Sequence, residues 1–204
     1  MVEVRFTTPD LKALEIFLGK MVERGAKLKP VLRKIGVVLE GITDRNFEAQ
    51  GRPIKWRKRS PVTTANLVWG AKNKAKATKK YQNAKKAKTK DSILRHEALR
   101  HKSNLILHQS GVLKQSITSI ADDKTVRIGA LKHVKYARIH QFGGVIRPKN
   151  KTYLFVPFGK KVLRLKKVII PARPYLIVPP SEMPGLTRAA LEAFTKELIG
   201  GIRL

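Results

Sequence analysis

Apolar residues recur at helical spacing over the first quarter of the chain. Between residues 9 and 49 they fall three or four positions apart, which is the period of one helix face. Thr8 and Pro9 have the character of a helix start, and Pro30 either kinks the run or restarts it in a first turn. The pattern predicts two helices in line, or one kinked helix, over about 9–49. Weak alternation over 2–6 predicts a short strand before them.

A different pattern, strict alternation, dominates the second half of the chain. Residues 117–119 and 125–129 flank a polar turn and predict a β-hairpin. A further strand is expected over 134–142. Residues 153–157 and 162–165 predict another pair of strands, joined across a glycine, with a proline that places the first strand at a sheet edge or ends it.

The C-terminal part combines prolines with a last helical stripe. Five prolines between 171 and 184 predict an extended, rigid crossing. A helix is expected from about Pro184, with one apolar face and a stop at two glycines; the face holds Leu186, Ala190, Phe194 and Leu198. The order of elements predicts an α+β fold with N-terminal helices, an antiparallel β-sheet and a C-terminal helix. We expect a single domain over 1–204.

The net charge of the chain indicates which kind of ligand it binds. The 204 residues carry 44 Lys and Arg against 14 Asp and Glu, a formal net charge of +30. A chain of this charge is drawn to polyanions, so nucleic acid, anionic lipid or an acidic protein is expected as a ligand. A merely solubilising surface is the alternative.

Much of this charge lies in a Lys/Ala-rich stretch over 71–102. Like charges three and four positions apart weaken an isolated helix, and little here is apolar. We expect a basic, extended arm that projects or is partly disordered and orders against a polyanion, or else a solvated loop without contacts. The predicted nucleic-acid contacts are its lysines, as point charges on phosphates: Lys72, Lys74, Lys76, Lys79, Lys80, Lys85, Lys86, Lys88 and Lys90.

Residues 50–70 lack periodicity and contain two turn signals, at Gly51-Arg52-Pro53 and Ser60-Pro61. Trp56 stands there among cations. It is expected to anchor a loop against the core, and stacking on a nucleic-acid base is the alternative.

The chain lacks the residues that several classes of chemistry need. The chain has no cysteine, which excludes disulfides, cysteine-ligated zinc and thiol catalysis and agrees with a reducing compartment. His96 and His101 are five apart, which is not the spacing of a helical metal pair, and acids are scarce. No cofactor, metal site or enzymatic activity is expected. No apolar run approaches the roughly 20 residues of a membrane span, and the N-terminus lacks a signal-peptide core, so we expect a cytoplasmic product with no membrane contact.

One dense stretch, Tyr136–Gly144, holds a histidine between aromatic residues. His140 could act as a general base. We favour a structural role, in a central strand with its ring nitrogens bonded to the backbone or to Gln141, and with a sharp exit turn at Gly143 and Gly144. The residues assigned to this structural motif are Tyr136, His140, Gln141, Gly143 and Gly144.

Several short motifs follow one another in a fixed order. They are Gly51-x-Pro53-x-x-Trp56, Ser110-Gly111-Val112-Leu113-x-x-Ser116-Ile117, Val126-Arg127-Ile128-Gly129, Tyr136-Ala137-x-Ile139-His140-Gln141-x-Gly143-Gly144 and Ile170-Pro171-Ala172-Arg173-Pro174-Tyr175-Leu176. This order resembles the Mu/P2-type phage virion morphogenesis family, the tail-completion or neck proteins, from the first helix to the last. The Lys/Ala stretch is longer and more basic than that family's pattern.

The resemblance implies a structural virion protein without catalytic residues. It implies a homo-oligomeric ring, with a hexamer as one option, at the head–tail junction of the virion, assembled in the bacterial host cytoplasm. Partners would be further copies, other neck and tail proteins such as the tail terminator and head-closure or connector proteins, and genomic DNA, which passes through the ring and is bound without sequence preference.

Subunit contacts of such a ring are expected at the edge strand and in the proline-rich crossing, at Tyr153, Phe155, Arg173, Pro174 and Tyr175. The alternative function is a free, sequence-independent nucleic-acid-binding protein of ribosomal or nucleoid type. An enzyme such as a nuclease ranks third, because paired acids are missing.

Overall fold

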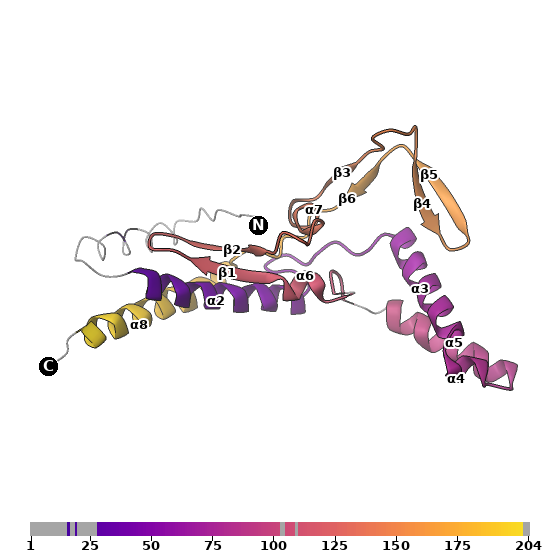
Figure 1. Cartoon of the computed structure of the whole chain (residues 1–204), viewed down its shortest axis with the longest axis horizontal. Helices are drawn as coiled ribbons and strands as arrows, with labels where there is room; N and C mark the ends of the chain where they lie inside the picture. The colour runs from indigo at the N-terminus through magenta and orange to yellow at the C-terminus, as the bar shows by residue number, and fades with distance from the viewer. Residues whose placement is uncertain (1–15, 17–18, 20–27, 103–104, 109, 202–204) are drawn as a thin grey trace. The chain divides into compact units, whose positions relative to one another are not determined.

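A computed structural model describes residues 16, 19, 28–102, 105–108 and 110–201 (Figure 1). The chain divides into two compact units. Unit 1 comprises Met1–Trp56, Ser110–Phe142 and Ala172–Leu204, and unit 2 comprises Arg57–Gln109 and Gly143–Pro171. The expected strand at 2–6 and the helix start at Thr8 and Pro9 lie outside the described residues. The expectation of a single domain stays a prediction beside this division.

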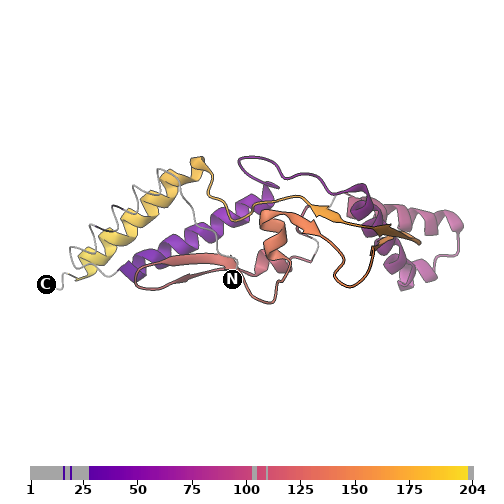
Figure 2. The same ribbon diagram turned by 90° about the horizontal axis from the view of Figure 1, so that it is seen from above.

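Unit 1 is built around helix α2, Leu28–Glu48. It packs against helix α8, Met183–Gly201, and against a β-hairpin (Figures 1 and 2). The predicted apolar stripe is buried: the core from α2 includes Val31, Leu32, Ile35, Leu39, Ile42 and Phe47. From α8 it includes Leu186, Ala190 and Phe194. Of the helical run predicted over about 9–49, the part in 28–48 is confirmed, and most of 9–27 lies outside the described residues. The helix predicted from about Pro184 is confirmed, but it includes Gly200 and Gly201, where a stop was expected.

The hairpin of unit 1 consists of β1, Ile117–Ala121, and β2, Val126–Ala130, which pair antiparallel with Ile117 opposite Ala130. This confirms the predicted hairpin and its polar turn. The hairpin lies close to α2 because Gly36 has no side chain: a Cβ atom there would be 2.5 Å from Ser119 Oγ. The short helix α6, Val112–Gln115, precedes β1.

The strand predicted over 134–142 is wrong. Residues Ala137–Phe142 form helix α7 instead. Its two buried residues are Ala137 and Gln141, which are four positions apart and so share one helical face. The aromatic and branched residues between them suggested a strand, but the positions that pack inward follow the helical period. Gly143, with φ of +70°, follows the helix in a conformation that favours glycine.

Unit 2 contains three further helices: α3, Pro61–Lys76; α4, Lys79–Gln82; and α5, Ala87–Lys102. Two expectations are corrected here. Residues 61–70 are helical, because Ser60 caps α3 and Pro61 occupies its first turn. The Lys/Ala-rich stretch is helical rather than extended, because α3 and α5 pack on each other over the small buried side chains of Ala71 and Ala75.

Unit 2 also contains the β-arm, a name we use for residues 143–171. Its strands β3, Gly144–Ile146, and β6, Val168–Ile170, form one antiparallel ladder, and β4, Leu154–Phe158, and β5, Lys161–Leu165, form another. The predicted strand pair across Gly159 is confirmed. The strands of the described residues form three separate two-stranded sheets, not the single sheet expected. The α+β class is confirmed.

The proline-rich crossing of unit 1, residues 172–179, has no regular secondary structure, as predicted. It leads into a 3₁₀ turn, Pro180–Glu182, and then into α8.

Candidate functional site

Two buried amide side chains hold the proline-rich crossing in unit 1. Gln141 of α7 accepts hydrogen bonds at Oε1 from the backbone N–H groups of Tyr175 (2.9 Å) and Leu176 (3.0 Å), and its Nε2 donates to Leu176 O at 3.5 Å. Asn46 of α2 donates from Nδ2 to the carbonyls of Tyr175 (2.9 Å) and Ile177 (2.8 Å). We call this arrangement the amide clasp, formed by Asn46 and Gln141. It satisfies backbone groups that no sheet partner serves.

The clasp is extended by an ion-pair group at the end of α2. Arg52 donates from Nε to Asn46 Oδ1 at 3.0 Å and from Nη1 to Glu182 at 2.6 Å. Arg45 donates to both carboxylate oxygens of Glu182, at 3.0 and 2.8 Å. The hydrogen bonds from Arg45, and then those from Arg52, hold the pKa of Glu182 below its usual value.

Aromatic packing fixes the same segment from the side. Tyr175 is fully buried, and its hydroxyl donates to Ala137 O at 3.1 Å; burial raises the pKa of this phenol. The Tyr175 ring lies 5.3 Å from that of Phe47, which meets the Trp56 ring edge-on at 5.6 Å. Trp56 Nε1 donates to Pro174 O at 3.0 Å. Trp56 is thus the core anchor that the sequence favoured.

Gly51 makes the Trp56 loop possible. Its φ is +101°, and a Cβ atom there would lie 2.6 Å from Ile54 O and 2.7 Å from Trp56 N. Only glycine fits this turn without strain. The motif Gly51-x-Pro53-x-x-Trp56 therefore describes a loop that positions the Trp56 indole against the crossing.

His140 lies on α7, half-buried, with its ring 5.8 Å from that of Tyr136. Its backbone carbonyl accepts from Arg173 N at 2.7 Å. Burial, and then the charge of Arg173, lower the pKa of His140. Its Nδ1 atom is buried without a hydrogen-bond partner among the described residues, so the expectation that the backbone or Gln141 satisfies the ring nitrogens is wrong for this atom.

The predicted subunit contacts fall into two groups. Tyr175 and Arg173 are buried inside unit 1, and Pro174 is half-buried. Tyr175 therefore has no exposed surface in this chain, Arg173 has little, and Pro174 has part of its surface exposed. Tyr153 and Phe155 are exposed on the β-arm, at 37% and 54%. The interface stays a prediction for all five residues, and exposure favours Tyr153 and Phe155.

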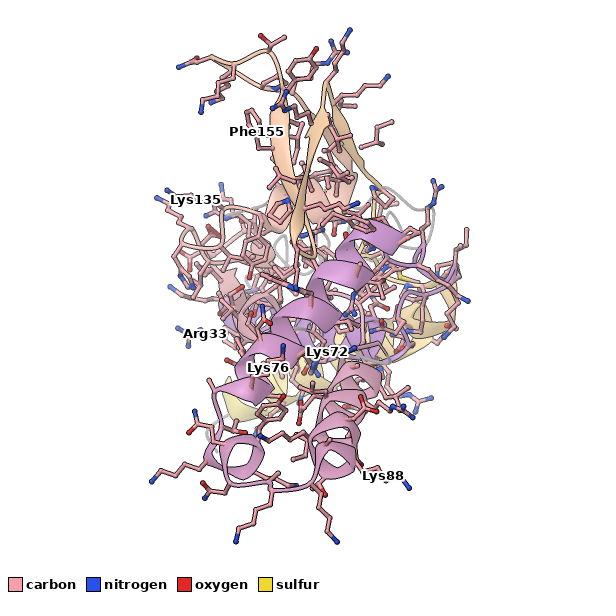
Figure 3. All side chains as sticks on the ribbon, turned by 90° about the vertical axis from the view of Figure 1, so that its right-hand side faces the viewer. Arg33, Lys72, Lys76, Lys88, Lys135 and Phe155 are labelled. Atoms are coloured by element: carbon pink, nitrogen blue, oxygen red, sulfur yellow. The ribbon has the colours of Figure 1, made fainter. Side chains whose placement is uncertain are left out.

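The nine predicted contact lysines lie on α3, α4, α5 and the turns between them. Seven are exposed, and Lys72 and Lys90 are half-buried. Figure 3 shows Lys72 and Lys76 on α3 and Lys88 extending outward from α5. Unit 2 as a whole carries 23 of the 44 Lys and Arg but only two acids, Asp91 and Glu97. The positive charge of the chain is therefore concentrated in one unit.

Among the described residues, no group of three or more His, Asp or Glu side chains could hold a metal ion. Within the same residues no helix combines the length and apolar character needed to cross a membrane.

The sequence reasoning missed Asn46, Arg52 and Glu182. Asn46 had a detectable signal, because it is a polar residue on the apolar face of α2, between Ile42 and Phe47. Its partners lie 129 and 131 residues later in the chain, and no spacing rule connects them.

Comparison with known protein families shows where the chain belongs. The model of the phage virion morphogenesis family matches residues 9–198. The matched range includes the amide clasp, the Trp56 loop, both ladders of the β-arm and the lysine-bearing helices. No curated protein and no solved structure matches the chain.

Proposed function

The chain belongs to the phage virion morphogenesis family, and on that premise we propose that it is a tail-completion or neck protein that forms a ring at the head–tail junction. Membership gives the chain a structural or assembly role in making the phage particle. The proposal adds the position in the virion, the homo-oligomeric ring, the passage of DNA through it, and contacts with other neck and tail proteins such as the tail terminator and connector.

The observation that carries the ring is an exposed apolar face on the β-arm. Phe155 and Val162 are 54% and 59% exposed. Pro157 is opposite Val162 and Arg164 is opposite Phe155, and alternation places these four residues on one face of the β4–β5 ladder. All four are exposed. In the other ladder, Val145 and Ile169 are opposite each other and are 52% and 65% exposed.

Such a face is unusual for a protein that acts alone. A two-stranded ladder is marginally stable in water, and exposed apolar surface of this kind marks protein contacts. A second copy that covers Phe155 and Val162 would remove that surface from water and supply the missing packing partner.

The charge of the β-arm favours one kind of contact between copies over another. Residues 143–171 contain eight Lys and Arg and no acid. Two β-arms placed face to face would bring like charges together, so an isologous contact is disfavoured. The β-arm of one copy therefore meets a different surface of the next copy. A head-to-tail contact of this kind closes into a ring when the rotation allows it.

Sedimentation velocity and light scattering of the purified chain test the proposal. The wild type should give one species of several times the 23.0 kDa chain mass, with a ring in negative-stain images. The double variant Phe155→Ser, Val162→Ser should sediment as a monomer. The matched control is Val37→Ser on α2, which is 61% exposed in unit 1 and should leave the ring intact. A wild type that stays monomeric alone and with tail proteins, and never joins phage particles, would refute the proposal.

A further inference from the structure

The end of the helical pair in unit 2 has an unusual composition. We define the helical tip as residues 72–90, which include the last turn of α3, all of α4 and the start of α5. The tip contains nine lysines and no acid. The first acid after it is Asp91, which pairs with Arg95 at 2.8 Å. The tip is therefore a continuous block of uncompensated positive charge.

This block is held on an ordered backbone. Thr78 caps α4 by accepting from Tyr81 N at 3.3 Å, and Ser60 caps α3 by accepting from Thr63 N at 3.1 Å. Lys90 Nζ lies over the Tyr81 ring, 5.5 Å from its centroid. A ligand thus meets lysines that are already displayed, and little folding has to accompany binding.

The surroundings of the lysines distinguish the kinds of polyanion. Residues 72–90 present no exposed large hydrophobic side chain. The cores of protein–protein interfaces are apolar and poor in lysine, so an acidic protein is a poor fit to the tip. Single-stranded nucleic acid needs aromatic platforms, and the tip has only Tyr81, which is half-buried under Lys90. A duplex backbone needs neither, because its phosphates take point charges directly.

We propose that the helical tip binds the phosphate backbone of double-stranded DNA without reading its sequence. The β-arm has the opposite character, with exposed apolar residues, so the two parts of unit 2 serve different partners. The inference rests on the proposed function for the identity of that duplex as the packaged genome, but the binding itself can be measured apart from any particle.

Fluorescence anisotropy of the full chain with a labelled duplex, at two salt concentrations between about 50 and 200 mM, measures the contact. The tip variant replaces four exposed lysines with glutamine, which keeps helix propensity: Lys79, Lys80, Lys85 and Lys86. The control removes four exposed cations of unit 1 in the same way: Arg33, Lys34, Lys132 and Lys135. Circular dichroism checks that both variants keep their helices.

The tip variant should bind the duplex at least about tenfold more weakly and lower the salt slope by about three to four, one for each lost phosphate contact. The control should change both values far less, and two duplexes of different sequence should bind equally. Wild-type helicity should stay the same when duplex is added.

Three outcomes would overturn the inference. The first is an equal loss of duplex affinity in the tip variant and in the control. The second is tighter binding to a thymidine oligonucleotide than to the duplex. The third is displacement of the duplex by polyglutamate at matched charge. Complementation of a phage that lacks its own copy reports separately on the proposed function. A tip variant that forms full particles but binds no duplex leaves the head–tail role standing.

Discussion

Replacing Asn46 with alanine should destabilise unit 1 more than any surface change of similar size. Asn46 is fully buried and makes three hydrogen bonds: two from Nδ2 to the carbonyls of Tyr175 and Ile177, and one to Oδ1 from Arg52. A net hydrogen bond is worth about 1 kcal/mol, and a buried partner left unpaired costs about 1–3 kcal/mol. The expected loss in unfolding free energy is about 3–5 kcal/mol.

Urea unfolding followed by tryptophan fluorescence measures this loss. The Trp69→Phe background leaves Trp56 as the only indole, and Trp56 is buried beside the crossing in unit 1. With a denaturant slope of about 1–3 kcal/mol per molar urea, the midpoint should fall by about 1–5 M. The matched control is Asn73→Ala, an exposed asparagine on α3, which should move the midpoint by little.

A second substitution separates the donor role of Asn46 from its shape. Asn46→Asp keeps the size of the side chain and an acceptor for Arg52, but it turns an oxygen towards two carbonyl groups. Its carboxylate should destabilise unit 1 at neutral pH at least as much as alanine does. An Asn46→Ala unfolding free energy within about 0.5 kcal/mol of wild type, or an Asn46→Asp variant of full stability, would refute the clasp as the element that fixes the crossing.

Three further changes test neighbouring parts of unit 1. Gln141→Leu removes the acceptor of two buried backbone N–H groups and should cost about 2–4 kcal/mol in the same urea assay; a loss below about 0.5 kcal/mol would contradict this. Gly51→Ala should cost at least about 1–3 kcal/mol from strain, whereas Gly70→Ala, where a Cβ atom meets nothing within 4 Å, should be neutral or stabilising. The pKa of His140 in the folded protein lies below its usual 6.5. The stability that the neutral imidazole contributes is therefore fully present above about pH 6.5 and is lost as the pH falls towards the folded-state pKa. His140→Asn should flatten the decline in stability below about pH 6.5, and a parallel decline in both proteins would exclude His140 as its source.

The regular elements that bury one face were predictable from sequence. The stripe of α2, the stripe of α8 and the two β-hairpins follow the periods 3.6 and 2 closely, because each buries one side and exposes the other. These patterns were sufficient to predict the α+β class.

The helices of unit 2 and α7 were not predictable by the same rule. The contact between α3 and α5 uses Ala71 and Ala75, whose small side chains give almost no hydropathy signal. In α7 the buried position that shares a face with Ala137 is a glutamine, so the inward face does not stand out as apolar. Both elements are recognisable only once their packing partners are known.

The amide clasp lies beyond local reasoning for a different reason. Tyr136–Gly144 and Ile170–Leu176 are two of the ordered motifs in the sequence, and Gln141 joins them by hydrogen bonds. The third participant, Asn46, is separated from Tyr175 by 129 residues. Hydrogen bonds between such distant residues depend on the tertiary fold, which no spacing within one stretch encodes.

The three-segment composition of unit 1 has a consequence for how the chain is made. Its last segment begins at Ala172, after every residue of unit 2 has already been synthesised. At translation rates of about 5–20 residues per second, Tyr175 is synthesised on the order of ten seconds after Asn46, its hydrogen-bond partner. During that interval the apolar face of α2 lacks α8, so the ribosome-bound chain carries a complete, strongly basic unit 2 beside an unfinished unit 1. Any nucleic acid or assembly partner that binds the nascent protein therefore contacts the charge of unit 2 before the hydrophobic core of unit 1 can form.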